Sequence, residues 1–197
     1  DLAVDNGVIV VVAAGNSGPR GNDACRTYAN DGSKESICSP GTSRKAITIG
    51  ASWKKDYEPF WWDCTPGEII SPTAAPCAPN VIPNVCPAEG RMWCNYWGEE
   101  TPKVDNVTGF SSRGPVKWAN LSGTFQISKP DIVAPGALIC AARYDSISPI
   151  GEHPYYVPCL DEAHVQMAGT SMATPVASGA VALIKQAHPD WTPDEIK

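Results

Sequence analysis

The most constraining feature of the sequence is a continuous apolar run near its start, Val8 to Ala14, which contains four valines. An apolar run without polar alternation is typical of a parallel strand that is covered on both faces. Gly15 and Asn16 follow directly, at the carboxyl end of the expected strand, which is where open α/β sheets build their sites. The run therefore predicts an α/β domain with a mainly parallel sheet.

Three further segments have patterns of regular structure. Residues 46–51 and 137–142 are short β-branched or apolar runs that predict strands. The only long helical pattern runs from Ser171 to Ala187, where almost every residue is apolar or small. We expect this helix to be central and buried, and to end at His188 and Pro189.

Residues 53–106 show no sustained periodicity and contain five tryptophans, four cysteines and many prolines. Because so long a structureless loop is rare in a compact domain, we interpret this segment as an insertion that carries its own disulfides. Its tryptophans form either a small core, which we favour, or a surface for a ligand or partner. The predicted organisation is one partial domain, 1–197, with the insertion inside it.

The eight cysteines occur singly in loop-like surroundings, without the C-x-x-C pairs that suit zinc. They predict disulfides formed in an oxidising compartment, and therefore a secreted protein. Two glycosylation sequons, at Asn106 and Asn120, agree with a secreted glycoprotein. The cysteines are Cys25, Cys38, Cys64, Cys77, Cys86, Cys94, Cys140 and Cys159.

Charge and hydropathy exclude two classes of partner. The formal net charge is -6, and no basic run or face occurs, so we expect no binding to nucleic acid. The longest apolar stretches, 8–14 and 176–184, are shorter than the ~18 residues that a membrane-spanning helix needs. We therefore expect no membrane insertion, and the sequence contains no metal-binding motif.

Ser171 is the first candidate for chemistry, because it stands at the start of the predicted helix. The free backbone N–H groups and the positive dipole at that end favour negative charge nearby. A serine there is also explained by simple N-capping. The nucleophile elbow of α/β hydrolases fits less well, since its G-x-S-x-G pattern requires glycine where this chain has Ala173.

Asn16 is the second candidate, although asparagine is also common in turns. Together the two candidates lie in blocks that resemble the subtilisin-like serine peptidases, the subtilases, and the resemblance spans nearly the whole chain outside the insertion. Four blocks match in the family's order: VVVAAGNSGP at 10–19, GFSSRGP at 109–115, KPDIVAPG at 129–136 and GTSMATP at 169–175.

The resemblance implies a three-layer subtilisin-like fold and assigns roles to both candidates. Ser171 becomes the nucleophile that forms an acyl-enzyme, and the Asn16 side-chain amide donates to the oxyanion, together with the Ser171 N–H. Further residues are expected near the substrate: Ala13, Ala14, Gly15 and Thr170. By the same analogy the segment near Cys38 approaches the floor of the pocket, where a Cys25–Cys38 disulfide is expected.

The resemblance also shows what these residues lack. In the family the catalytic Asp and His precede the oxyanion Asn, and neither Asp1 nor Asp5 fits the motif of the Asp. None of the histidines, His153, His164 and His188, stands where the family has its base. We therefore expect this chain alone to be inactive.

Both ends suggest that the polypeptide is longer. Residues 1–7 are typical of the last turn of a helix with a glycine cap, and 192–195 form a capping box that opens another helix. We expect the missing amino-terminal part of the domain to be supplied by upstream sequence or by a separate chain.

The remaining expectations concern accessory groups and rival functions. Asp131 is expected to have a structural role, capping or bonding backbone. No cofactor is expected to be required, and the resemblance leaves calcium open. The rival functions are a catalytically dead homologue used as a binding module, and a peptide ligase that uses the same acyl-enzyme.

Overall fold

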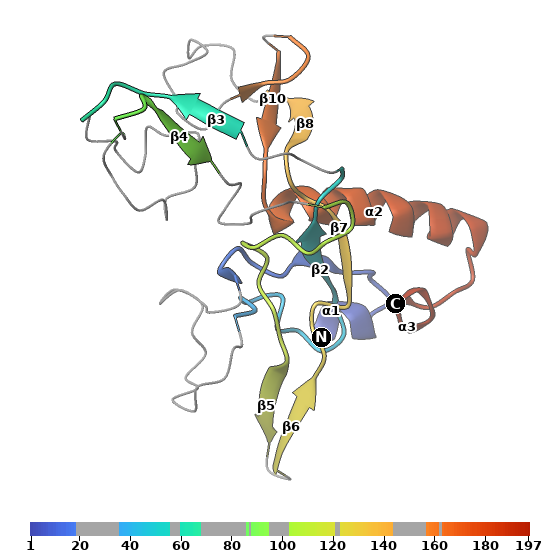
Figure 1. Cartoon of the computed structure of the whole chain (residues 1–197). Helices are drawn as coiled ribbons and strands as arrows, with labels where there is room; N and C mark the ends of the chain where they lie inside the picture. Colours follow the sequence, from blue (N-terminus) through green and yellow to red (C-terminus); the bar gives the residue numbers. More distant parts are fainter. Residues whose placement is uncertain are drawn as a thin grey trace. The chain divides into compact units, whose positions relative to one another are not determined.

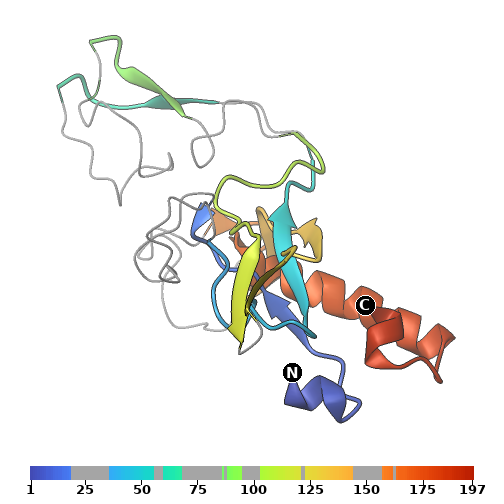
Figure 2. The same ribbon diagram turned by 90° about the horizontal axis from the view of Figure 1, so that it is seen from below.

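A computed structural model of the chain describes residues 1–18, 36–55, 60–67, 86, 88–94, 103–120, 123–143, 157–161 and 163–197 (Figures 1 and 2). The chain divides into two compact units. The first unit contains Asp1–Ser52, Phe110–Ile139 and Ala168–Lys197, and the second contains Trp53–Gly109 and Cys140–Met167. Asn16 and Ser171 both belong to the first unit.

A parallel sheet of three strands forms the centre of the first unit. Its order is β1 (Val11–Ala13), β2 (Ile47–Ser52) and β7 (Ile132–Pro135). Val11 pairs with Ile47, and Ile49 pairs with Ile132, in both cases in the parallel sense. The predicted α/β class with a parallel sheet is confirmed, although β1 is shorter than the apolar run 8–14.

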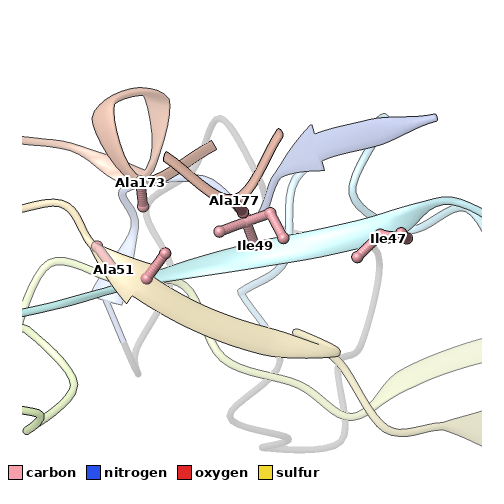
Figure 3. Close-up of a cluster of buried hydrophobic side chains, with 6 residues drawn as sticks. Ile47, Ile49, Ala51, Ala173 and Ala177 are labelled. Atoms are coloured by element: carbon pink, nitrogen blue, oxygen red, sulfur yellow. The ribbon is translucent and has the colours of Figure 1, made fainter. Parts of the chain in front are cut away.

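The long helix α2 (Thr170–Ala187) packs on this sheet (Figure 1). Ile47, Ile49 and Ala51 alternate along β2 and share one face, as the period of a strand requires. They meet Ala173 and Ala177 of α2 in one buried cluster (Figure 3). Small residues on the helix allow its backbone to come close to the sheet.

The expectation that α2 is buried all round is wrong for the part of the chain that the structure describes. Only Thr170, Ala173 and Ala177 are buried in it. On another side of the helix Val176 and Leu183 are 43% and 67% exposed, and Ile184, near the end of the helix, is 37% exposed. The apolar composition is real, but the described elements cover only the face that points to the sheet.

The first unit has two short helices and a hairpin around this core. Helix α1 (Leu2–Asp5) is followed by Gly7, whose φ is +82°. Helix α3 (Pro193–Ile196) begins with the predicted capping box. The hairpin of β5 (Val116–Asn120) and β6 (Gly123–Ile127) was not predicted. It is anchored by the Trp118 indole N–H, which donates to the Thr42 carbonyl at 3.0 Å.

The described residues of the second unit form two small sheets. One pairs β3 (Phe60–Asp63) with β4 (Arg91–Cys94) in the antiparallel sense. The other has the order β8 (Ile139–Ala142), β10 (His164–Met167) and β9 (Val157–Pro158). The strand predicted over 137–142 is thus β8, which does not join the parallel sheet.

Disulfides are present as predicted. Cys64 is bonded to Cys86 and Cys140 to Cys159, both in the second unit. Cys38 is also disulfide-bonded, but its predicted partner Cys25 lies outside the described residues, so this pairing stays a prediction. The extent of the predicted insertion, 53–106, also stays a prediction, since many of its residues lie outside the described ranges. No helix within the described ranges is long and apolar enough to cross a membrane.

Candidate active site

Asn16 is hydrogen-bonded to Thr170, the residue that directly precedes Ser171 in the chain. Asn16 follows β1, and Thr170 is the first residue of α2. The Thr170 backbone N–H donates to Asn16 Oδ1 at 2.8 Å, and the Thr170 hydroxyl donates to the same oxygen at 2.9 Å. Residues that are 154 positions apart in sequence thereby share one hydrogen-bond network.

This network fixes the orientation of the Asn16 amide. A backbone N–H can only donate, so the side-chain atom that it meets must be the oxygen Oδ1. The Asn16 Nδ2 group is therefore turned away from Thr170. It lies beside Gly169, where an added methyl group would be 3.3 Å from it, and among the described residues it has no acceptor.

Thr170 itself is fully buried. Its hydroxyl donates to Asn16 and also accepts the Gly15 N–H at 3.2 Å. The side chain thus holds the end of β1 against the start of α2. A substrate contact by Thr170, predicted from the sequence, would have to use its backbone.

The start of α2 is set against the sheet by a close approach at Gly136, directly after β7. Gly169 N–H donates to the Gly136 carbonyl at 2.8 Å. A methyl group on Gly136 would lie 2.8 Å from the Gly169 carbonyl oxygen and 2.7 Å from Ala51 Cβ. Only glycine fits there, and the contact fixes the height of Ser171 above the sheet edge.

The backbone around Ser171 leaves one donor without an acceptor. Met172 and Ala173 donate to the Gly169 carbonyl at 2.9 and 3.3 Å, and the Thr170 N–H is bonded to Asn16. Within the described chain the Ser171 N–H has no acceptor. Ser171 N–H and Asn16 Nδ2 are therefore two free donors close to the start of one helix, whose dipole also favours an anion.

A groove of about 510 Å³ opens beside Ser171. It is lined by residues of β1 and the first turns of α2, together with Pro40: Val11, Val12, Ala13, Ser171, Thr174, Pro175 and Ser178. Ala13, one of the predicted substrate-binding residues, shares this groove with Ser171. Ala14 is fully buried, and Gly15 packs against Cys38, whose sulfur would lie 2.5 Å from a methyl group on Gly15.

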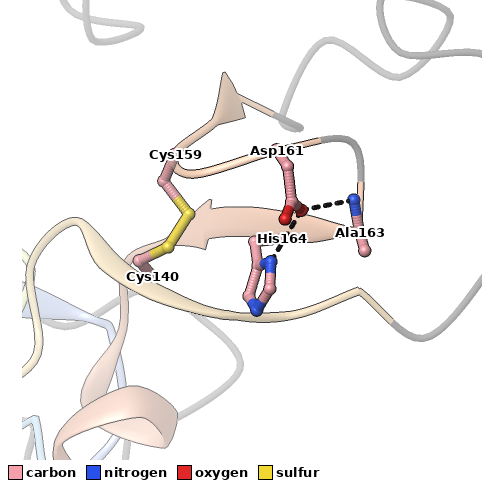
Figure 4. The surroundings of a disulfide bond; sticks show 5 residues. All are labelled: Cys140, Cys159, Asp161, Ala163 and His164. Carbon is pink, nitrogen blue, oxygen red and sulfur yellow. Dashed lines mark hydrogen bonds and ion pairs between the residues drawn. A yellow bond between two sulfur atoms is a disulfide. The ribbon is translucent and has the colours of Figure 1, made fainter.

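The histidines of the described chain are engaged elsewhere. In the second unit His164 Nδ1 is 2.7 Å from Asp161 Oδ1, which also accepts the Ala163 N–H at 2.8 Å (Figure 4). The contact with His164 is the main cause that lowers the pKa of Asp161. His188 stacks on Trp191 with ring centroids 3.8 Å apart. Seventeen helical steps separate His188 from Ser171, which is about 25 Å; His153 lies outside the described residues.

Asp131 has the structural role that the sequence predicted. Its Oδ2 accepts the Thr48 N–H at 2.7 Å and the buried Lys129 ammonium at 2.6 Å. Lys129 also donates to the Ala46 carbonyl at 2.9 Å. Burial lowers the pKa of Lys129, and the bond to Asp131 acts in the opposite direction. The pair ties the start of β7 to β2.

No group of three or more His, Cys, Asp or Glu side chains that could hold a metal ion occurs among the described residues. Calcium therefore remains an open expectation.

No role was predicted from the sequence for Ser111 and Ser112, although both lie in the GFSSRGP block. Their contacts could not be foreseen, because their hydrogen-bond partners are distant in the chain.

A parallel sheet with a serine at the start of a helix and a free amide donor beside it is an architecture of serine hydrolases. The model of the Subtilase family matches residues 1–197, the whole chain. Serine protease AprX of Bacillus subtilis (strain 168) is 32% identical over 197 residues, which is 97% of this chain and 29% of AprX. The chain belongs to the subtilase family.

Other relatives match over shorter stretches. Subtilisin-like protease SBT3.9 of Arabidopsis thaliana is 48% identical over 91 residues, or 46% of this chain and 10% of that protein. Among solved structures, a cold adapted subtilisin-like serine proteinase matches 98% of this chain and 37% of its own, at 21% identity and a TM-score of 0.46. The chain thus spans well under half the length of the relatives it matches.

Proposed function

We propose that this chain is the nucleophile-bearing part of a serine endopeptidase that hydrolyses peptide bonds through an acyl-enzyme on Ser171. The observation that carries this function is the pair of free donors, Asn16 Nδ2 and Ser171 N–H, beside a serine that lines a groove. Membership in the subtilase family supports it.

In this function Ser171 Oγ attacks the carbonyl carbon of the substrate and loses its proton to a base. The C–O bond to Ser171 forms, and the carbonyl oxygen becomes an anion that accepts hydrogen bonds from Asn16 Nδ2 and Ser171 N–H. The C–N bond then breaks, and the amine leaves with the proton from the base. Water then attacks the acyl carbon and gives a proton to the base, the C–O bond to Ser171 breaks, and Ser171 Oγ regains that proton as the acid is released.

The donors assist catalysis because they are preorganised. Thr170 holds Asn16 Oδ1 with two hydrogen bonds, so the Nδ2 group needs no reorganisation when charge develops on the substrate. Such a donor stabilises the transition state more than the bound substrate, and therefore raises kcat.

The base and its orienting carboxylate are proposed to come from outside these residues. His188 is at the far end of α2, and Asp131 is bound to Lys129 and the sheet. We infer that an Asp and a His are supplied by the missing amino-terminal part of the domain, in the same or a separate chain. The exposed apolar face of α2, with Val176 and Leu183, is the surface that we assign to this part.

The expected substrates are proteins or peptides, with the residue before the scissile bond lying against Ala13, Ala14 and Gly15. Disulfides at Cys64–Cys86 and Cys140–Cys159 support secretion to an oxidising compartment. Glycosylation at Asn106 and Asn120 belongs to the same proposal, and no nucleic-acid or membrane partner is expected.

Two rivals use the same residues differently. A catalytically dead homologue would act as a binding module, but such a module has no need of both a serine in a groove and two free donors. A peptide ligase would form the same acyl-enzyme and transfer it to an amine instead of water. Analysis of the products with an added acceptor amine separates the ligase from the hydrolase.

The experiment that tests this function is labelling with a fluorophosphonate, which reacts with an activated serine. The complete protein that contains this chain should be labelled at Ser171, as located by peptide mapping. The Ser171→Ala variant should keep its far-ultraviolet circular dichroism and lose both the label and the peptidase activity. Turnover that survives in Ser171→Ala would overturn the assignment.

A further inference from the structure

Two adjacent serines in the GFSSRGP block, Ser111 and Ser112, are fully buried. A buried hydroxyl needs hydrogen-bond partners, because leaving it without them costs about 1–3 kcal/mol. Both serines accept a backbone N–H with their side chains, but at two different places in the first unit. Neither has a part in the function proposed above.

Ser112 is bonded to the loop that carries Asn16. Its Oγ accepts the Ser17 N–H at 3.0 Å, and its own N–H donates to the Gly15 carbonyl at 2.9 Å. Asn16 lies between these two residues. The backbone on each side of the oxyanion donor is therefore bonded to a single residue of a distant segment.

A third contact extends this link. Gly18 N–H donates to the Phe110 carbonyl at 2.8 Å, so residues 110–112 run beside 15–18. Close packing keeps Ser112 at this distance, since a methyl group added to Gly15 would lie 3.0 Å from Ser112 Oγ. The Ser112 hydroxyl is the side-chain part of a contact that is otherwise made by backbone.

Asn16 thus has two kinds of support. Thr170 fixes its side-chain amide, and Ser112 fixes the backbone from which that side chain projects. Both are needed to place Nδ2, because rotation of the backbone at Asn16 moves the amide even when Oδ1 keeps its partners. Catalysis is sensitive to such shifts, and a displacement of about 1 Å can cost about 10²-fold in rate.

We propose that Ser112 is a positioning residue for the oxyanion donor, and that it acts on the transition state through Asn16. This inference rests on the proposed function. It adds a residue that is not assigned a contact with substrate. It also gives the two serines of the GFSSRGP block different roles, since Ser112 supports the loop of Asn16 and Ser111 supports β2.

Ser111 provides a matched control on the neighbouring position. It has the same side chain and the same complete burial, but its Oγ accepts the Ala51 N–H of β2 at 3.1 Å. Loss of this hydroxyl should weaken the sheet and leave the loop of Asn16 in place. The two serines therefore separate an effect on catalysis from an effect on stability.

The test uses the complete enzyme with the variants Ser112→Ala and Ser111→Ala, and kcat is normalised to the concentration of folded protein. We expect Ser112→Ala to lower kcat by about 10- to 100-fold with little change in KM. Ser111→Ala should lower the melting temperature and leave kcat within about twofold of the parent enzyme, since its hydrogen bond goes to β2 and not to the loop of Asn16.

A double-mutant cycle with Asn16→Ala tests whether Ser112 acts through Asn16. Without the amide, its position no longer matters, so Ser112→Ala in the Asn16→Ala background should lower kcat by less than about threefold. The same large loss in both backgrounds would overturn the inference, as would an unchanged kcat in Ser112→Ala.

Ser112→Cys covers the case in which Ser112→Ala does not fold. The thiol leaves no empty space, being somewhat larger than the hydroxyl, and it is a weak acceptor, so the predicted loss of kcat should persist in a folded protein. Failure of this inference is distinct from failure of the proposed function. If Asn16→Ala lowers kcat strongly and the Ser112 variants do not, Ser112 is structural; if Asn16→Ala has no effect, the proposed oxyanion site itself is wrong.

Discussion

The two compact units of this chain are stabilised in different ways. The first unit has a parallel sheet, a buried cluster on Ile49 and Ala177, and hydrogen bonds that join distant segments. In the second unit the described strands are short, β9 pairs with β10 and β3 with β4 in the antiparallel sense, and the Cys64–Cys86 and Cys140–Cys159 disulfides cross-link the chain. The contrast shows why the candidate chemistry is found in the first unit, since sub-ångström placement depends on dense packing around the site.

The largest effect on kcat is expected from a substitution at the candidate site of the first unit, compared with one in the second unit. Asn16→Ala removes one of the two free donors and should lower kcat by about 10²–10³-fold, a magnitude borrowed from an oxyanion-hole variant of a subtilisin. His164→Ala, in the second unit, should leave kcat within about twofold. Steady-state kinetics on the complete enzyme measures both, and a large loss in His164→Ala would break the division between the units.

Removal of a disulfide should affect the second unit alone. The Cys140–Cys159 bond spans 19 residues, and loss of such a link costs about 2–4 kcal/mol in the chain-entropy account. In Cys140→Ser/Cys159→Ser we expect faster protease cleavage within 140–167, with the cluster on β2 and α2 still protected. Mass spectrometry of the first fragments locates the cut, and early cleavage within the first unit would contradict the comparison.

The first unit should in turn be sensitive to a single methyl group. Gly136→Ala places an atom against the Gly169 carbonyl and Ala51, so it should lower the free energy of unfolding by about 1–3 kcal/mol. Because the shift would also move the start of α2, kcat should fall as well. Denaturant unfolding and kinetics on the complete enzyme test this, and an unchanged kcat would show that Ser171 is not set by this contact.

The smallest expected effect is pH dependence in the second unit. The bonds from His164 and from the Ala163 N–H hold the pKa of Asp161 below the ordinary value of 3.8 for an aspartate. A lowered pKa in the folded state stabilises the ionised form, so the contribution is complete above the ordinary value and is lost as pH falls through the folded pKa. Amide exchange at Ala163 should therefore accelerate, relative to β2, only in this acidic range. Asp161→Asn should remove the difference.

Local patterns predicted the parts of the fold that depend on local sequence. The helix at Ser171, the strand of 46–51 and the capping box at Thr192 follow from periodicity and capping residues, and all three are present. Strand β7 was missed because Pro130 and Pro135 flank its short apolar run, and proline demotes a strand prediction. The hairpin of β5 and β6 was missed because the two residues between its strands, Leu121 and Ser122, lack the Asn-Gly type of turn signature.

The candidate site shows the same limit. The motifs identified Asn16 and Ser171, and the structure bonds Asn16 to Thr170, the residue before Ser171, but their catalytic roles stay predictions. The support given by Thr170 and Ser112 could not be foreseen, since it depends on contacts between residues about a hundred or more positions apart. The exposed side of α2 could not be foreseen either, because an apolar helix does not reveal which of its faces a given set of residues covers.

The hydrogen bonds around Asn16, from Thr170 to its side chain and between Ser17 and Ser112, have a consequence for the chemical stability of this asparagine. Asparagine deamidates when the next backbone nitrogen attacks the side-chain carbonyl, and the product would replace the Nδ2 donor by an anionic oxygen. Here the Ser17 nitrogen is directed to Ser112, and Asn16 Oδ1 is held by Thr170. The ring closure that starts deamidation is therefore hindered at Asn16, where the reaction would put a negative charge into the proposed oxyanion site.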